Sequence, residues 1–264
     1  MRILCLNGWG GTMHGALLPW LQDMQPDIVC LQEVVHTPTA QQDWLTYRDG
    51  DHVLPQRARF HAEVCAALPG YHAQFCPAAQ GVLWDAEASV PSQWGLATYV
   101  HPSLTVIGQV QGFVHRDYSP HGYGDHPRSR MAHGVRVQDP RRARPVGVLH
   151  MHGLRDLAGK HDTPERRAQA HKLADFARVL AQPADDLVVC GDFNVGPDSD
   201  TLDILRALGL RELVTGYDIP STRTSRYKKP GRFADYMLVN MAEQAFEVIT
   251  DPEVSDHCPL LLTL

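Results

Sequence analysis

Short apolar runs recur along the whole chain and alternate with polar stretches and with segments of helical periodicity. The runs predict strands near residues 2–6, 27–31, 94–100, 103–110, 131–138, 145–151, 186–190, 233–239, 245–249 and 259–264. Helical patterns cover residues 12–23, 56–68 and 200–208, and a further helix begins at Thr163. These patterns indicate a mixed α/β protein.

The helix after Thr163 has the clearest local signals. Thr163 is a good N-cap and is followed by Pro164 and Glu165. An apolar stripe then continues through Ala168, Leu173, Phe176, Ala177 and Leu180. By contrast, residues 112–130 and 215–232 show no periodicity, and we expect two long loops there, of the kind that is often functional. The first loop is rich in histidine, but the spacing matches no zinc motif and favours a loop on the substrate side.

Polar side chains come directly after several of the apolar runs. Asn7 and Glu33 follow two of them, Asp192 and Asn194 follow a third, and the pair Asp256-His257 precedes the last strand. Groups that prefer water or a polar partner at strand ends mark a site more often than a core. The set is dominated by oxygen ligands, which suit magnesium or manganese, and therefore favours a metal-dependent phosphoester hydrolase.

The chain resembles the endonuclease/exonuclease/phosphatase superfamily of metal-dependent phosphohydrolases. Six motifs carry this resemblance in the family's order, and they span almost the whole chain: Leu6-Asn7, Leu31-Gln32-Glu33, His150-Met151-His152, Gly191-Asp192-Phe193-Asn194, Phe233-Ala234-Asp235-Tyr236 and Ser255-Asp256-His257. The resemblance implies an α/β four-layer sandwich, with two packed, mainly antiparallel β-sheets flanked by helices and the site at one end. One departure is the tryptophan that the family often has beside the first asparagine, because here Leu6 precedes Asn7 and Trp9 follows Gly8.

The same resemblance implies roles around a bound Mg²⁺ or Mn²⁺. Glu33 is the strongest metal candidate, and Asn7 and Asp256 would complete or orient the metal shell. Asp192 would orient or deprotonate the water that attacks phosphorus in line with the leaving oxygen, and Asn194 would hold that water or a phosphoryl oxygen. The alternatives are ordinary structural ones: a helix cap or surface ion pair for Glu33, and turns for Asn7 and for Asp192 with Asn194.

Two histidines complete the implied set. His257 would donate to a non-bridging phosphoryl oxygen, and Asp235 would accept its other N–H and raise the pKa of the imidazole. His152 should touch the same phosphate, while His150 is interpreted as a supporting or packed histidine. Cys258 adjoins His257, but no positive environment that would form a thiolate is evident, which favours a core thiol over a nucleophile.

Length, composition and charge indicate the number of domains, the location of the protein and the class of substrate. With 264 residues and 44% hydrophobic residues, the chain can bury a sizeable core, and we expect one domain over residues 1–264. The first residues enter a strand at once without a long apolar segment, so we expect a cytoplasmic protein, monomeric and without a membrane segment. The net charge of −6 does not favour nucleic acid as the partner.

Basic residues gather in two places. Arg128, Arg130, Arg136, Arg141, Arg142 and Arg144 form a first cluster, which we interpret mainly as a solvated hairpin around a turn at Asp139-Pro140. The second cluster leads into Asp235, and Arg226, Lys228 and Arg232 are its candidate substrate-binding residues.

Three functions compete. The leading one is hydrolysis of a phosphodiester or phosphomonoester in a small or nucleotide-like substrate. A DNA nuclease or abasic-site endonuclease is the narrower alternative, and a catalytically silent binding module of the same fold is an alternative from another class. The intact set of acidic residues, with Asn194 and His257, argues against the silent module.

Overall fold

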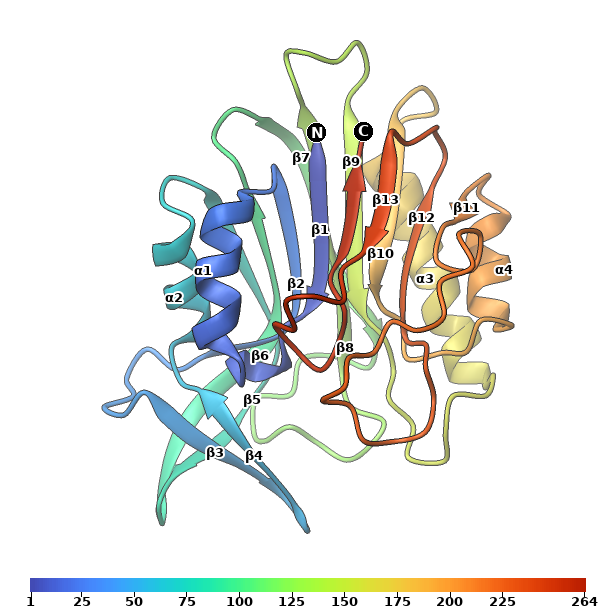
Figure 1. Ribbon diagram of the computed structural model, residues 1–264. Coiled ribbons are helices and arrows are strands. Elements are labelled where there is room, and N and C mark those ends of the chain that lie inside the picture. Colours follow the sequence, from blue (N-terminus) through green and yellow to red (C-terminus); the bar gives the residue numbers. More distant parts are fainter.

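Two β-sheets pack face to face in the computed structural model, which describes residues 1–264 (Figure 1). Helices α1 (His14–Met24) and α2 (Phe60–Ala67) lie on the outer side of one sheet. Helices α3 (Pro164–Leu180) and α4 (Asp200–Arg206) lie on the outer side of the other. This arrangement confirms the predicted four-layer α/β sandwich. No helix has the length and apolar character needed to cross a membrane.

The first sheet has eight strands in the order β13-β14-β1-β2-β6-β5-β3-β4. Its strands are β1 (Arg2–Asn7), β2 (Ile28–His36), β3 (Trp44–Asp49), β4 (His52–Arg57), β5 (His72–Asp85), β6 (Ala88–Val100), β13 (Ala245–Val248) and β14 (Leu260–Thr263). The second sheet has six strands in the order β11-β12-β10-β9-β8-β7. Its strands are β7 (Thr105–His115), β8 (Arg130–Gln138), β9 (Val146–His152), β10 (Asp186–Asp192), β11 (Arg211–Glu212) and β12 (Asp235–Val239). A short 3₁₀ helix, Trp9–Gly11, follows β1.

One parallel pair lies in the middle of each sheet, and the other pairings are antiparallel. Strands β1 and β2 are parallel in the first sheet, and β9 and β10 are parallel in the second. The carboxyl ends of these four strands reach the same end of the sandwich (lower end in Figure 1). The β7–β8 loop and the loop of residues 215–232 also gather there, but the β7–β8 loop covers only residues 116–129 of the predicted 112–130, because β7 continues to His115 and β8 begins at Arg130. The polar residues at those ends are therefore brought together by the topology.

Helix α3 shows why its segment folds as predicted. The hydroxyl of Thr163 accepts a hydrogen bond from the backbone N–H of Arg166 at 3.2 Å, and Pro164 occupies the first turn. Ala170, Leu173 and Ala177 are buried on one face against the six-stranded sheet, as the 3.6-residue period requires.

The part of the fold that the periodicity missed is the outer half of the eight-stranded sheet. Strands β3, β4 and β5 and the first half of β6 were not predicted, and the first residues of the predicted helix at 56–68 belong to β4. Many side chains of β3 and β4 are exposed, and Pro55 interrupts the pattern of β4. These strands carry little apolar alternation because they extend past the core as a hairpin (Figure 1).

Candidate active site

The polar residues at the strand ends converge in one place. Asp192, the last residue of β10, pairs in register with Asp235 on one side and with His152 on the other. Asn7 ends β1 opposite Gln32, and His257 lies just before β14. The two sheets thus bring five of the sequence-predicted residues to one end of the sandwich.

Asp192 lies at the centre of the cluster. Its Oδ2 accepts a hydrogen bond from Asn7 Nδ2 at 3.0 Å and lies 3.7 Å from Nε2 of both His152 and His257. Burial alone would raise the pKa of Asp192, but the nearby positive charges of His257, Arg223 and Lys160 hold it well below its usual value. The carboxylate is therefore ionised throughout the physiological pH range.

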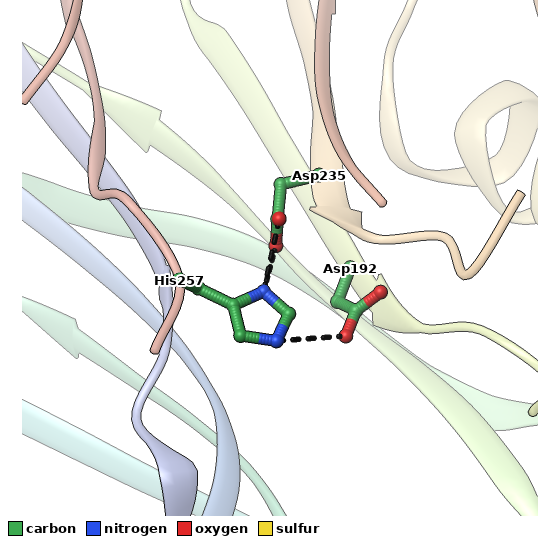
Figure 2. A group of neighbouring side chains, drawn as sticks. All are labelled: Asp192, Asp235 and His257. Carbon is green, nitrogen blue, oxygen red and sulfur yellow. Dashed lines mark hydrogen bonds and ion pairs between the residues drawn. The ribbon is translucent and has the colours of Figure 1, made fainter. Parts of the chain in front are cut away.

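Asp235 and His257 form a buried pair (Figure 2). Nδ1 of His257 lies 2.8 and 2.9 Å from the two oxygens of Asp235, and Thr222 donates to Asp235 Oδ2 at 2.9 Å. Burial lowers the pKa of His257, but the attraction of Asp235 outweighs this effect, and the net shift is upward. The contact predicted between these two residues is present.

His152 has the opposite electrostatic environment. It is 4% exposed, and its Nε2 points between Glu33 Oε1 at 3.9 Å and Asp192 at 3.7 Å. Its ring lies against Trp94, with 5.3 Å between the ring centroids. Burial, assisted by the charge of Arg130, holds the pKa of His152 well below its usual value. The imidazole is therefore neutral at pH 7.

Glu33 enters the site because strand β2 is irregular at this point. The register of β2 with β6 shifts between Leu31 and Val34, and Glu33 has a φ of 54°. A left-handed backbone at a residue other than glycine is a strained feature that recurs at functional sites. Here it turns the carboxylate into the site, and the Glu33 side chain is 29% exposed.

The positive charges near Glu33 and Asp256 are too weak to offset the effects that raise the pKa values of these two carboxylates. The pKa of Glu33 is raised by removal from water and then by the negative charge of Asp256. The pKa of Asp256 is raised by burial, with Asp235 and Asp192 adding to the shift. Such a pair would be stabilised by a cation, so these oxygen donors fit a divalent metal ion.

A second group, Asp192, Asp235 and His257, has ligand atoms within 4.8 Å of one another and could also hold a metal ion. In this group, however, both ring nitrogens of His257 already have a partner, Asp235 at Nδ1 and the Arg223 guanidinium at Nε2, and a metal on either nitrogen would displace one of them. The hydrogen-bonding pattern therefore favours Glu33 and Asp256 as the site of the cation.

Asn194 lies at the edge of the cluster in a tight turn. Its φ is 55°, its backbone N–H donates to Asp192 Oδ1 at 3.0 Å, and its Nδ2 donates to the carbonyl oxygen of Gly153 at 3.3 Å. Arg166 bonds to the Asn194 carbonyl oxygen at 3.4 Å. The turn that was the structural alternative therefore exists, and it places the Asn194 side chain on the cleft.

An open cleft of about 550 Å³ lies over these residues, and cations dominate its walls. Glu33, Asn194, Asp256 and His257 line it, together with the basic residues Arg155, Lys160, Arg166, Arg223, Arg226, Lys228 and Lys229. A cleft of this charge suits an anionic substrate.

The predicted basic residues differ in where they lie. Arg226 and Lys228 line the cleft, but Arg226 also pairs with Glu253 at 3.2 Å, and Lys228 donates to the carbonyl oxygen of Ser225 at 2.8 Å. Arg232 is exposed and does not line the cleft. The backbone of Arg232 is held by Thr222, whose N–H donates to the Arg232 carbonyl oxygen at 2.8 Å, and the residue stays exposed to solvent.

Two members of the predicted basic clusters, Arg223 and Arg130, were not chosen as substrate-binding candidates but have stronger positions. The guanidinium of Arg223 contacts His257 Nε2 and stacks 4.2 Å above the ring of Tyr227. Arg130 was assigned to a solvated cluster but is only 3% exposed. Its position as the first residue of a buried strand was the signal that could have marked it. The Cys258 thiol is buried, which raises its pKa to about 12 and agrees with a core thiol.

Sequence comparison agrees with this geometry. The profile of the Endonuclease/Exonuclease/phosphatase family matches residues 6–257, from the end of β1 to the histidine before β14. The chain belongs to this family. A human protein named endonuclease/exonuclease/phosphatase family domain-containing protein 1 is 25% identical over 134 residues, which cover 43% of this chain and 23% of that protein. The chain thus matches less than a quarter of this relative's length.

Solved structures of family members share the fold. A mannosyl-6-phosphatase from Bacteroides thetaiotaomicron has a TM-score of 0.69 at 13% identity, with 99% of this chain and 98% of that chain covered. The catalytic domain of human Nocturnin, solved with a bound sulfate anion, has a TM-score of 0.65 at 17% identity, with 99% and 92% covered. Identities this low show a common architecture and leave the substrate open.

Proposed function

We propose that the protein is a divalent-metal-dependent hydrolase of phosphoester bonds in a small or nucleotide-like substrate. The observation that carries this proposal is the position of Asp192 Oδ2, 3.7 Å from Nε2 of both His152 and His257, beside a cationic cleft that His257 and Asn194 line. Family membership supports the reaction class, since the family comprises endonucleases, exonucleases and phosphatases.

Asp192 orients the attacking water in this proposal. A carboxylate with so low a pKa is a weak base, so its main contribution is to accept a hydrogen bond from the water and align it in line with the leaving oxygen. Asn7 fixes this carboxylate, because its Nδ2 donates to Asp192 while its Oδ1 accepts from the backbone N–H of Trp9 at 3.0 Å. Asn194 holds the water or a phosphoryl oxygen from the other side.

The two histidines act on the phosphoryl group in different protonation states. Asp235 favours the imidazolium form of His257, which donates from Nε2 to a non-bridging oxygen. In the free protein the Arg223 guanidinium contacts that nitrogen, which can accept its hydrogen bond only when the imidazole is neutral. A bound phosphoryl oxygen would lie between the two groups and accept hydrogen bonds from both the Arg223 guanidinium and the His257 imidazolium. His152 stays neutral and donates from Nε2 without adding a charge.

Glu33 and Asp256 would hold Mg²⁺ or Mn²⁺, with Asn7 supporting the arrangement. When bound, the ion would withdraw charge from a phosphoryl oxygen and so offset the charge that builds up during attack.

The test is a substrate screen with Mg²⁺, with Mn²⁺ and with a chelator. It should include nitrophenyl phosphates, cyclic nucleotides, lipid head-group esters, sugar phosphates, and plain or abasic DNA. We expect turnover of a small phosphoester that stops when the metal is removed. Turnover restricted to DNA would instead identify the nuclease alternative, and the absence of turnover on every phosphoester would refute the proposal.

A further inference from the structure

A smaller side pocket of about 90 Å³ adjoins the catalytic cleft. The two cavities share Glu33, His52, Leu54 and Arg155, so the pocket opens beside the carboxylate assigned to the metal. Aromatic rings of Tyr47, Trp94 and Tyr123 form much of its wall, and Arg128 and Arg130 add positive charge. None of these aromatic and arginine side chains has a role in the proposed reaction at Asp192. Their presence in the pocket therefore needs a separate explanation.

Arg130 is the unusual member of the pocket. It is 3% exposed, and its Nε donates to the carbonyl oxygen of Gly153 at 2.8 Å. Its Nη1 is buried and has no hydrogen-bond partner, and no carboxylate oxygen lies within 4.0 Å of the guanidinium. Burial lowers the pKa of Arg130 to about 10, so the group is still charged at neutral pH.

The charges of Glu33 and Asp192 act on Arg130 from a distance, but neither forms a direct ion pair with it. A buried charge without a directly paired counter-ion is costly. The ring of Trp94, 5.0 Å from the guanidinium carbon, offers only a weak cation–π contact. The free N–H group of Arg130 is therefore suited to an anion that enters the pocket from the cleft.

The wall around this arginine is held in place by Arg128. Its Nη2 pairs with Asp49 Oδ2 at 2.9 Å, its Nε donates to the carbonyl oxygen of Gly124 at 2.9 Å, and its guanidinium lies 5.6 Å from the Tyr47 ring centroid. The contacts with Asp49 and Tyr47 hold the β7–β8 loop (residues 116–129) against the β3–β4 hairpin. A pocket with fixed walls does not have to order them when a ligand binds.

Gly81 on β5 shows how closely the loop is fitted. A Cβ atom at this position would lie 2.5 Å from the ring of Tyr123, so only glycine leaves room for that ring on the strand. The long loop that the sequence suggested on the substrate side therefore closes one wall of the side pocket.

We propose that the substrate carries, besides the phosphoryl group that is hydrolysed, a second compact anionic group that binds Arg130 in the side pocket. This group is a phosphate or a carboxylate, and Arg155, at the shared mouth of the two cavities, assists its entry. A volume of 90 Å³ is below the ~150 Å³ of a cavity known to hold benzene, so it suits a phosphate or carboxylate and excludes a whole nucleoside. The inference rests on the proposed function, because it places the reacting phosphoryl group at Asp192.

Binding is tested by calorimetry on the Mg²⁺-loaded protein with three unreactive ligands. Propylphosphonate has one anionic group, propane-1,3-bisphosphonate has two phosphonates, and 3-phosphonopropionate has one phosphonate and one carboxylate. We expect at least one of the two bifunctional ligands to bind about 10-fold or more tightly than propylphosphonate, because a hydrogen bond to a charged group contributes this much. The stronger of the two identifies the second anion as a phosphate or a carboxylate.

Variants assign the preference to the pocket. In Arg130→Gln the ratio of the affinity for the bifunctional ligand to that for propylphosphonate should fall towards one. Arg155→Gln, which removes a charged side chain at the mouth of the pocket, should lower this ratio by less. Arg178→Gln, on the exposed last turn of α3, is the matched control and should keep the preference. If Arg130→Gln does not fold, the comparison of Arg155→Gln with Arg178→Gln decides the matter.

Equal affinity for all three ligands in the native protein would overturn the inference, as would an equal loss of preference in the pocket and control variants. The same experiments separate it from the proposed function. A pocket-dependent preference in a protein that hydrolyses no phosphoester would keep the subsite and reject the hydrolase. Metal-dependent hydrolysis without any preference would keep the hydrolase and reject the subsite.

Discussion

His152 and His257 occupy similar positions, yet their surroundings favour opposite protonation states. Both are 4% exposed, and both place Nε2 3.7 Å from the same oxygen of Asp192. Nδ1 of His257 meets the Asp235 carboxylate, whereas Nδ1 of His152 is buried without a partner. Burial lowers the pKa of each, and only His257 has a carboxylate at Nδ1, which reverses the effect.

The comparison shows how two histidines beside one carboxylate can have different chemical roles in one site. Environments that move the pKa values of neighbouring groups apart separate charged from neutral donors at a single pH. Here the register of β12 separates the two pKa values, because it places Asp235 next to Asp192 and within hydrogen-bonding distance of His257 Nδ1. The predictions that follow alter this arrangement in turn.

Removing the carboxylate that the two histidines share should have the largest effect. Asp192→Asn keeps the shape but loses the negative charge that orients the attacking water, so kcat should fall about 10²–10⁴-fold while substrate affinity changes little. Steady-state kinetics on the best substrate of the metal screen measures this. Asp203→Asn, at an exposed position of α4, should keep native kcat. Near-native turnover of Asp192→Asn would remove Asp192 from the reaction.

Removing the carboxylate that only His257 has should make the two histidines alike. Asp235→Asn takes away the attraction that raises the pKa of His257, so burial should then bring it below 6.5, while the pKa of His152 should stay low. NMR titration of the imidazole signals in the metal-free protein follows both groups. We also expect kcat to fall about 10²-fold, since the imidazolium is the proposed donor.

An unchanged pKa of His257 in Asp235→Asn would show that its Nδ1 contact does not govern its protonation. Thr222→Val offers a milder version, because it keeps the Asp235 carboxylate and removes the hydroxyl that positions it, which donates to Asp235 Oδ2 and accepts from the backbone N–H groups of Ala234 and Asp235. The shift in pKa should have the same direction and a smaller size. A shift that appears in His152 instead would contradict the assignment of the two environments.

Much of the fold and of the central site could be predicted because each part has a local signal. The apolar runs that end in Asn7 and Asp192, and the polar pair that precedes β14, are visible in the sequence itself. The family motifs supply the roles of these residues. His150 was interpreted as supporting or packed, and its Nδ1 and Nε2 indeed meet Gln32 at 3.1 Å and Thr98 at 2.8 Å inside the core. Strand-end residues need no knowledge of distant partners.

The side pocket could not be predicted, because its parts come from segments whose meeting depends on tertiary contacts. Arg130 gains its significance only when β8 lies across from β6 and brings it to Trp94. The β3–β4 hairpin has too little apolar alternation to be recognised as two strands. Arg232 failed to reach the cleft for a similar reason, since the path of a long loop is not encoded in its charge.

The second carboxylate beside His152, that of Glu33, allows a test of the metal assignment. Glu33→Gln removes a ligand charge, and Mg²⁺ affinity measured by calorimetry should fall about 10-fold or more. The pKa of Glu33 is raised, so its ionised form is disfavoured in the folded metal-free protein at neutral pH. The metal-free variant should therefore be at least as heat-stable as the native protein. Unchanged metal affinity would place the ion elsewhere, with the Asp192, Asp235 and His257 group as the alternative.

The smallest expected effect concerns the outer cations of the cleft, which lie on the His257 side. Arg226 is partly neutralised by Glu253, and Lys228 is held by a backbone carbonyl, so few free charges remain for a long polyanion. We expect kcat/KM to depend weakly on salt, well below the slope of about 0.9 logarithmic units per phosphate contact that polymeric DNA would give for each tenfold rise in salt. A salt series on the native protein and on the triple variant Arg226→Ala, Lys228→Ala, Lys229→Ala measures the slope. A steep slope that flattens in the variant would identify a nucleic acid as the substrate, and the small-substrate proposal would then have to be abandoned.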